Sequence, residues 1–264
     1  MFRFHVVTSP TTSSQDGLVL IDDLTTSPTA SPARFMATPL TTLGRVLLSE
    51  AVGTFVLVFL GCGAIMVDAR TGGLGTLGIA VAFGLAITVM IATVGHVSGA
   101  HFNPAVTAAL WARRVFPLHL VAPYVVAQIV GGTAAALTLR ASLGRIGNLG
   151  ASVPSGSSSQ AFVWECILTA LLVSVILAVA TDPRAAGQTA ALVIGGTVAL
   201  GALVGGPISG ASMNPARTLA PALAGGPTTA LWVYLTAPLL GAAIAVGLFA
   251  ILTSSTRELE SDQT

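Results

Sequence analysis

Charged side chains are scarce in this sequence of 264 residues, and lysine is missing altogether. Asp, Glu, Lys and Arg together make up only 8% of the chain, whereas a soluble domain carries about a quarter. Hydrophobic residues make up 53%, and the formal net charge is +1. This balance excludes a soluble globular protein and gives no indication of a nucleic-acid partner. It predicts an integral protein of the lipid bilayer.

Cysteine is also rare, with only Cys62 and Cys166, both inside apolar runs. Two such residues do not form a disulfide framework, and we expect both to be buried thiols. His96 and His101 lie on either side of a predicted loop, which is a poor geometry for a metal pair. The sequence therefore predicts no metal ion and no other cofactor.

The first 40 residues differ from the rest, because Ser, Thr, Pro and Asp dominate them. We interpret residues 1–40 as a disordered cytoplasmic tail. No apolar segment follows the early Arg3, so this region is not a signal peptide. Met36 lies just before the first apolar run and is an alternative start of translation.

Six apolar stretches are long enough to cross the hydrocarbon core of a bilayer. They cover residues 43–67, 77–97, 118–139, 161–181, 187–206 and 230–252. We therefore expect one membrane-embedded domain over 41–253, made of one repeat over 43–139 and a second over 161–252. Residues 254–264 would form a C-terminal tail.

Two short segments, residues 98–105 and 209–216, share the pattern Ser-Gly-Ala, two further residues, then Asn-Pro-Ala. Asn is a strong helix N-cap and Pro is well tolerated at the first helical position, so each pattern predicts a helix start. A helix from 103 to about 113 is roughly 16 Å long, about half of the hydrocarbon thickness. We expect two half-helices, beginning at Asn103-Pro104-Ala105 and Asn214-Pro215-Ala216.

The two halves of the chain are related in sequence. Asn103 and Asn214 are 111 residues apart, and Glu50 and Glu165, near the start of each half, are 115 apart. Because each half has three spans, an odd number, the second half must enter the membrane from the opposite face. The predicted fold is all-α: six transmembrane helices and two re-entrant half-helices in an inverted repeat.

Arginine counts predict the orientation, because cytoplasmic loops carry the excess of positive charge. With the N-terminus inside, the arginines on the cytoplasmic side are Arg3, Arg34, Arg45, Arg113, Arg114, Arg184 and Arg257. Those outside are Arg70, Arg140 and Arg145. We expect a multi-pass protein of the plasma membrane with both termini in the cytoplasm.

Non-helical backbone at bilayer depth is tolerated only where protein buries it or where it lines a wet cavity. The loops before the half-helices therefore predict a pore. Each half-helix directs its N-terminus, equivalent to roughly +0.5 charge, at the midplane, and Asn103 and Asn214 offer amide donors there. Such a pore suits neutral molecules with an acceptor oxygen, repels cations and interrupts a proton wire.

Arg217 is a full charge in an apolar half-helix, which costs a few kcal/mol. We interpret it as a filter residue that donates hydrogen bonds to solutes; the alternative is an arginine held only by carbonyl groups. Glu50 and Glu165 are interpreted as acceptors that brace their own re-entrant loops, with a proton relay as the alternative.

Together these features resemble the major intrinsic protein family, the aquaporins and aquaglyceroporins, over about residues 43–252. The resemblance implies one pore per subunit, a homotetramer and passage of water and small neutral solutes. The motif from Gly206 to Arg217 is closest to the plant nodulin-26-like branch and its bacterial relatives, which also pass metalloid hydroxides.

The resemblance also implies a second constriction, formed by Phe83, Ala202, Ala211 and Arg217. These residues make a wider and less polar filter than that of strict water channels, which usually have His at the place of Ala202. Thr218 stands where glycerol facilitators commonly have Asp, and Tyr234-Leu235 replaces an aromatic pair of water channels. Water, glycerol, urea and metalloid acids remain open as preferred solutes.

Two other classes of protein share some of these features. A secondary transporter also uses broken helices in inverted repeats, but the sequence offers no further intramembrane carboxylate to couple an ion. An intramembrane hydrolase would need Ser98 or Ser209 as a nucleophile. Their surroundings do not match a nucleophile elbow, and no acid partner is evident. We therefore expect no enzyme activity.

Overall fold

The computed structural model describes residues 41–181 and 188–261, and its regular structure within these ranges is helical. The elements are α1 (Thr42–Thr71), α2 (Gly75–Ser98), α3 (Pro104–Ala112), α4 (Leu118–Leu143), η1 (Gly147–Gly150), α5 (Ser158–Thr181), α6 (Gln188–Ser209), α7 (Pro215–Leu223) and α8 (Leu231–Ser261). The predicted tail of residues 1–40 lies outside the described residues.

Six of these helices, α1, α2, α4, α5, α6 and α8, are long and apolar enough to cross a membrane. The other two α-helices, α3 and α7, have only nine residues each. The predicted fold class is confirmed, and most helix ends lie within about one turn of the predicted span boundaries. The largest difference is at α8, which remains helical to Ser261 although its apolar span ends at Thr253.

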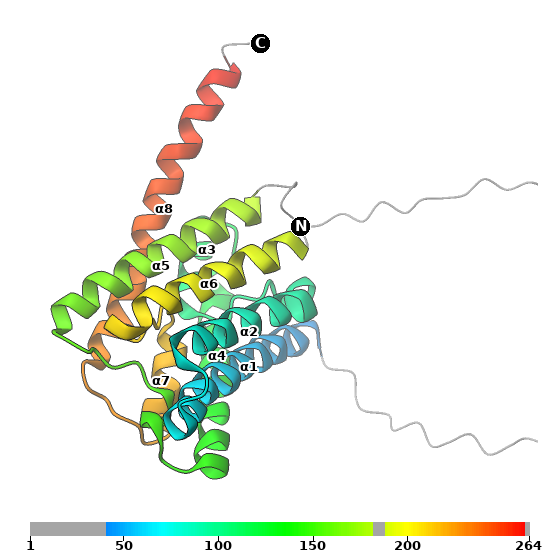
Figure 1. Cartoon of the computed structure of the whole chain (residues 1–264). Coiled ribbons are helices and arrows are strands. Elements are labelled where there is room, and N and C mark those ends of the chain that lie inside the picture. Colours follow the sequence, from blue (N-terminus) through cyan, green and yellow to red (C-terminus); the bar gives the residue numbers. More distant parts are fainter. Residues whose placement is uncertain (1–40, 182–187, 262–264) are drawn as a thin grey trace, which may run out of the picture. The chain divides into compact units, whose positions relative to one another are not determined.

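The helix contacts follow the internal repeat. In the first half α1 packs against α2 and α4, and in the second half α5 packs against α6 and α8. The two halves meet where α2 packs along α6 (Figure 1). Each half-helix packs mainly on the last span of the other half, α3 on α8 and α7 on α4. The two halves therefore enclose both half-helices together.

Glycine allows the closest helix contacts in both halves. A β-carbon on Gly131 of α4 would lie 2.0 Å from the backbone oxygen of Ala51 on α1. One on Gly241 of α8 would lie 2.2 Å from the backbone oxygen of Cys166 on α5. Lipid tails are as apolar as the helix surfaces, so the hydrophobic effect does not drive helices together within a membrane. Helix association there depends instead on close packing of this kind.

We predict that Gly131→Ala lowers the melting temperature of the protein in detergent. The new methyl group cannot avoid the backbone of α1, and overpacking of this kind costs about 1–3 kcal/mol. Gly247→Ala on α8 is the matched control, because a β-carbon there meets nothing within 4 Å. Equal melting temperatures for the two variants would contradict the close α1–α4 contact.

Candidate functional site

The two re-entrant loops have nearly the same backbone conformation. Each begins with a left-handed glycine that ends a long helix, Gly99 after α2 and Gly210 after α6, both with φ of 84°. Two non-glycine residues with positive φ follow in each loop: Ala100 and Phe102 at 52° and 49°, and Ala211 and Met213 at 41° and 52°. L-residues seldom adopt this region, so surrounding contacts must hold both loops in place.

The half-helices begin at the predicted asparagines. The side-chain oxygen of Asn103 accepts a hydrogen bond from the backbone N–H of Ala105 at 2.9 Å. That of Asn214 accepts from Ala216 at 3.0 Å and from Arg217 at 3.2 Å. Both asparagines are therefore N-caps, with Pro at the first helical position.

The amide nitrogens of the same asparagines join the two loops. Asn103 Nδ2 donates to the backbone oxygen of Met213 at 2.7 Å, and Asn214 Nδ2 donates to that of Phe102 at 2.8 Å. The sequence predicted amide donors for solutes but not this reciprocal lock. Because an amide group carries two N–H bonds, one on each asparagine remains for a molecule in the pore.

Glu50 binds the first loop with both carboxyl oxygens and is fully buried. Its Oε1 accepts from Ser98 Oγ at 2.8 Å and from the backbone N–H of His101 at 3.0 Å. Its Oε2 accepts from the backbone N–H of Phe102 and from Gln128 Nε2, both at 2.8 Å. Both oxygens act only as acceptors, as in an ionised carboxylate.

Glu165 has the corresponding position against the second loop and is also fully buried. Its Oε1 accepts from Ser209 Oγ and from the backbone N–H of Ser212, both at 2.8 Å. Its Oε2 accepts from the backbone N–H of Met213 at 2.7 Å. Each glutamate thus satisfies two backbone donors that the non-helical conformation leaves without a helical partner.

Two tyrosines, which the sequence analysis did not single out for this role, also bind the loops. Tyr124 Oη donates to the backbone oxygen of Ser98 at 2.8 Å, and Tyr234 Oη donates to that of Ser209 at 2.6 Å. The tyrosines are 110 residues apart, close to the spacing of the two Asn-Pro-Ala motifs. A search for matched polar residues at that spacing would have found them.

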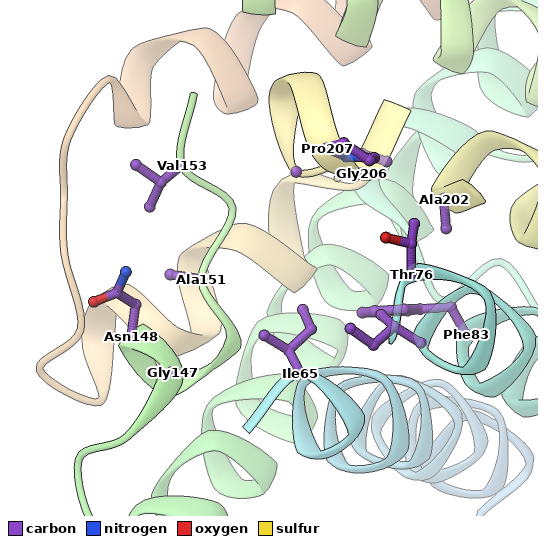
Figure 2. Close-up of a pocket in the computed structure, with 13 residues that line it drawn as sticks. Ile65, Thr76, Phe83, Gly147, Asn148, Ala151, Val153, Ala202, Gly206 and Pro207 are labelled. Atoms are coloured by element: carbon purple, nitrogen blue, oxygen red, sulfur yellow. The ribbon is translucent and has the colours of Figure 1, made fainter. Parts of the chain in front are cut away.

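A cavity of about 400 Å³ opens at the end of the bundle where α1 ends and α2 begins, which we call the filter end. Three of the four predicted filter residues, Phe83, Ala202 and Ala211, line it. Figure 2 shows Phe83 and Ala202 on one side of the cavity, and Asn148 and Val153 on the other. The wall near Phe83 is apolar except for the hydroxyl of Thr76, and α6 contributes Ala202, Gly206 and Pro207 to the lining.

The fourth predicted filter residue, Arg217, is only 1% exposed. Its guanidinium lies over the ring of Phe83, with its carbon 4.9 Å from the ring centroid. Its Nη1 donates to the backbone oxygen of Gly150 at 2.9 Å. Among the described residues, Nε and Nη2 have no hydrogen-bond partner. The carbonyl of Gly150 therefore satisfies only Nη1 of Arg217. The other two nitrogens remain without a hydrogen-bond acceptor, in a guanidinium that lies over an apolar ring.

Gly150 is a contact of Arg217 that sequence reasoning missed. It ends η1, in which Gly147, Asn148, Leu149 and Gly150 all have positive φ, between 52° and 70°. A β-carbon on Gly150 would lie 2.4 Å from that of Cys62, so only glycine fits there. In the sequence, only the glycines of this connection indicated an irregular backbone there. Cys62 and Cys166 are buried free thiols, as predicted.

Comparisons with known proteins agree with this geometry. The family described as Major intrinsic protein matches residues 38–249. The chain belongs to the major intrinsic protein family. It is 46% identical to Nodulin-26 of Glycine max over 215 residues, which cover 81% of this chain and 79% of that protein. It is 45% identical to Aquaporin NIP1-1 of Oryza sativa subsp. japonica, with coverage of 81% and 76%.

Among solved structures, the aquaglyceroporin from Plasmodium falciparum matches with a TM-score of 0.74 and 27% identity. The match covers 82% of this chain and 99% of that one. The chain is therefore a passive membrane channel for water and small solutes, and not an enzyme. The predicted family and general function are confirmed.

We predict that Glu165→Ala lowers the melting temperature strongly and reduces the yield of folded protein. It leaves the backbone N–H groups of Ser212 and Met213 buried without an acceptor, at about 1–3 kcal/mol for each. Glu165→Gln keeps one acceptor oxygen, so its melting temperature should fall less. Thr197→Ala, which removes an exposed hydroxyl bonded within its own helix, is the control. A Glu165→Ala protein as stable as the control would show that the carboxylate does not hold the loop.

Proposed function

We propose that this channel passes small neutral solutes larger than water, as well as water, and excludes protons and ions. Arg217, Phe83, Ala202 and Ala211 are proposed as its selectivity filter. The observation that carries this proposal is the buried Arg217, whose guanidinium lies over the ring of Phe83, a residue that lines the cavity, and whose Nε and Nη2 have no partner among the described residues. A solute with oxygens on one side and an apolar or compact neutral centre on the other matches both surfaces.

The two Asn-Pro-Ala motifs form a second proposed constriction at the midplane. Asn103 and Asn214 bind the opposite loops and cap the two half-helices, so both positive helix ends face the same region. A cation there would meet these dipoles, and the oxygens of Glu50 and Glu165 are directed at loop donors and do not coordinate it. Water held by the asparagine donors cannot form an unbroken proton wire.

The proposal also covers the oligomeric state of the protein and its orientation in the membrane. We expect a homotetramer in the plasma membrane with both termini in the cytoplasm. Exposed apolar residues along the spans, such as Leu85 on α2 and Leu171 on α5, supply surfaces for lipid or for other subunits. Arg70, Arg140 and Arg145 belong to the filter end, which the arginine bias assigns to the outside.

Stopped-flow light scattering on proteoliposomes tests the proposed selectivity, with water, glycerol, urea and boric acid as the solutes. We expect water flux together with flux of at least one larger solute. The flux should be proportional to the solute gradient and unaffected by imposed proton or sodium gradients. A protein that passes water and none of the larger solutes would overturn the wide-filter proposal.

We predict that Ala202→His reduces the flux of larger solutes far more than that of water. The imidazole fills space beside Phe83 and adds a polar group, and each 1.4 kcal/mol added to a transit barrier slows passage about tenfold. Ala202→Ser is the matched control, because it adds polarity with little volume and should stay close to the wild type. Equal loss of water and solute flux in Ala202→His would count against Ala202 as a filter residue.

A further inference from the structure

Two arginine side chains converge beside the filter end, outside the pore. Arg140 lies in the last turn of α4, and Arg145 follows in the connection to η1. Arg140 Nη1 and Arg145 Nη2 each lie 3.0 Å from the point that a β-carbon on Gly225 would occupy. The two nitrogens are therefore no more than twice that distance apart. Like charges this close repel each other unless an anion lies between them.

Protein groups satisfy only part of this pair. Arg140 Nη1 donates to the backbone oxygen of Ala224, the C-cap residue of α7, at 2.6 Å. Arg145 is exposed, and among the described residues its guanidinium has no hydrogen-bond partner. Gly225, with φ of +91°, has no side chain to separate the two arginines.

Among the described residues, no carboxylate forms an ion pair with either arginine. Asp68 is the only acidic residue in the stretches that form this end, residues 66–78, 138–160 and 205–234. Its Oδ1 already accepts hydrogen bonds from the backbone N–H groups of Leu74 and Gly75, at 3.0 and 2.8 Å. An external anion is therefore the remaining source of negative charge for Arg140 and Arg145.

The space for such an anion is an open pocket of about 360 Å³. It is lined by Arg145, Asn148, Leu149, Gly225, Gly226 and Pro227. Asn148 also lines the cavity that leads to the filter (Figure 2), so the two spaces have this residue in common. Asn148 carries an amide group, a neutral donor, and Arg140 approaches the pocket at Gly225 without itself lining it.

We propose that this pocket binds a phosphate group. Guanidinium groups bind phosphate through pairs of parallel N–H···O bonds, and a phosphate has enough oxygens to contact both arginines at once. The phosphate comes either from the headgroup of an anionic phospholipid or from a soluble phosphate at the membrane surface. Because Arg140 also binds the C-terminal end of α7, the site contacts the helix that carries Arg217.

The first test uses inorganic phosphate as the probe and the full-length protein in a neutral detergent. Its melting temperature is measured against phosphate concentration, with sodium chloride added to keep the ionic strength equal. We expect a saturable rise for the wild type. In Arg145→Gln the rise should be lost, or should need at least about tenfold more phosphate, as expected for the loss of a charge-assisted contact.

The control variant is Arg45→Gln, which removes an exposed arginine at the start of α1, at the opposite end of that helix from the pocket. It should respond to phosphate as the wild type does. Without phosphate, Arg145→Gln should melt near the wild-type temperature, because its side chain holds no other described group. No response in the wild type, or the same response in Arg145→Gln, would overturn the proposal.

A second experiment identifies the source of the phosphate. Native mass spectrometry compares retention of phosphatidylglycerol with that of phosphatidylcholine by the wild type and Arg145→Gln. Preferential retention of phosphatidylglycerol that is lost in the variant supports a lipid headgroup. Equal retention together with the saturable phosphate effect supports a soluble phosphate. The absence of both effects would contradict a phosphate site of either origin.

Discussion

Two buried carboxylates hold the two re-entrant loops, the non-helical segments between α2 and α3 and between α6 and α7. In lipid every backbone N–H needs a partner within the protein or in an enclosed wet cavity. Glu50 and Glu165 supply that partner for two amides in each re-entrant loop. With the loops fixed, the asparagines can cap the half-helices and bind across to the opposite loop. The pore thus depends on two carboxylates whose oxygens bind the loops.

The two repeats are not equivalent in this support. Glu50 also accepts a hydrogen bond from Gln128, whereas Pro238, at the corresponding place relative to the tyrosines, has no side-chain donor. In the first loop His101 pairs with Thr107, and in the second Ser212 pairs with Thr218. The half-helix after the second loop, α7, also gains contacts from the connection after α4: Thr218 Oγ1 donates to Ser152 Oγ, and Arg217 donates to the backbone oxygen of Gly150. That connection fixes the side of the pore that carries Arg217.

Most of the fold followed from the sequence because its signals are local. The length of the apolar stretches predicted the six spans, and the two Asn-Pro pairs predicted where the half-helices begin. The contacts missed are those whose partners come from distant or irregular segments. The Gly150 oxygen reaches Arg217 through a left-handed turn that no periodicity predicts, and the reciprocal asparagine bonds need both loops in place. The family resemblance, placed on this chain by the distance in sequence from Asn103 and Asn214, predicted Phe83, Ala202 and Ala211 as filter residues, and that role is a proposal.

Hydrogen–deuterium exchange of the wild-type protein in lipid tests the central claim most directly. The relevant amides are those of His101, Phe102, Ser212 and Met213, which belong to non-helical segments beside a wet pore. If the buried carboxylates hold them, they should exchange as slowly as amides in the interior of α1 or α5, because exchange requires the loop to open. Exchange at the rate of unprotected amides would contradict the account, since the loops would then lack the support attributed to Glu50 and Glu165.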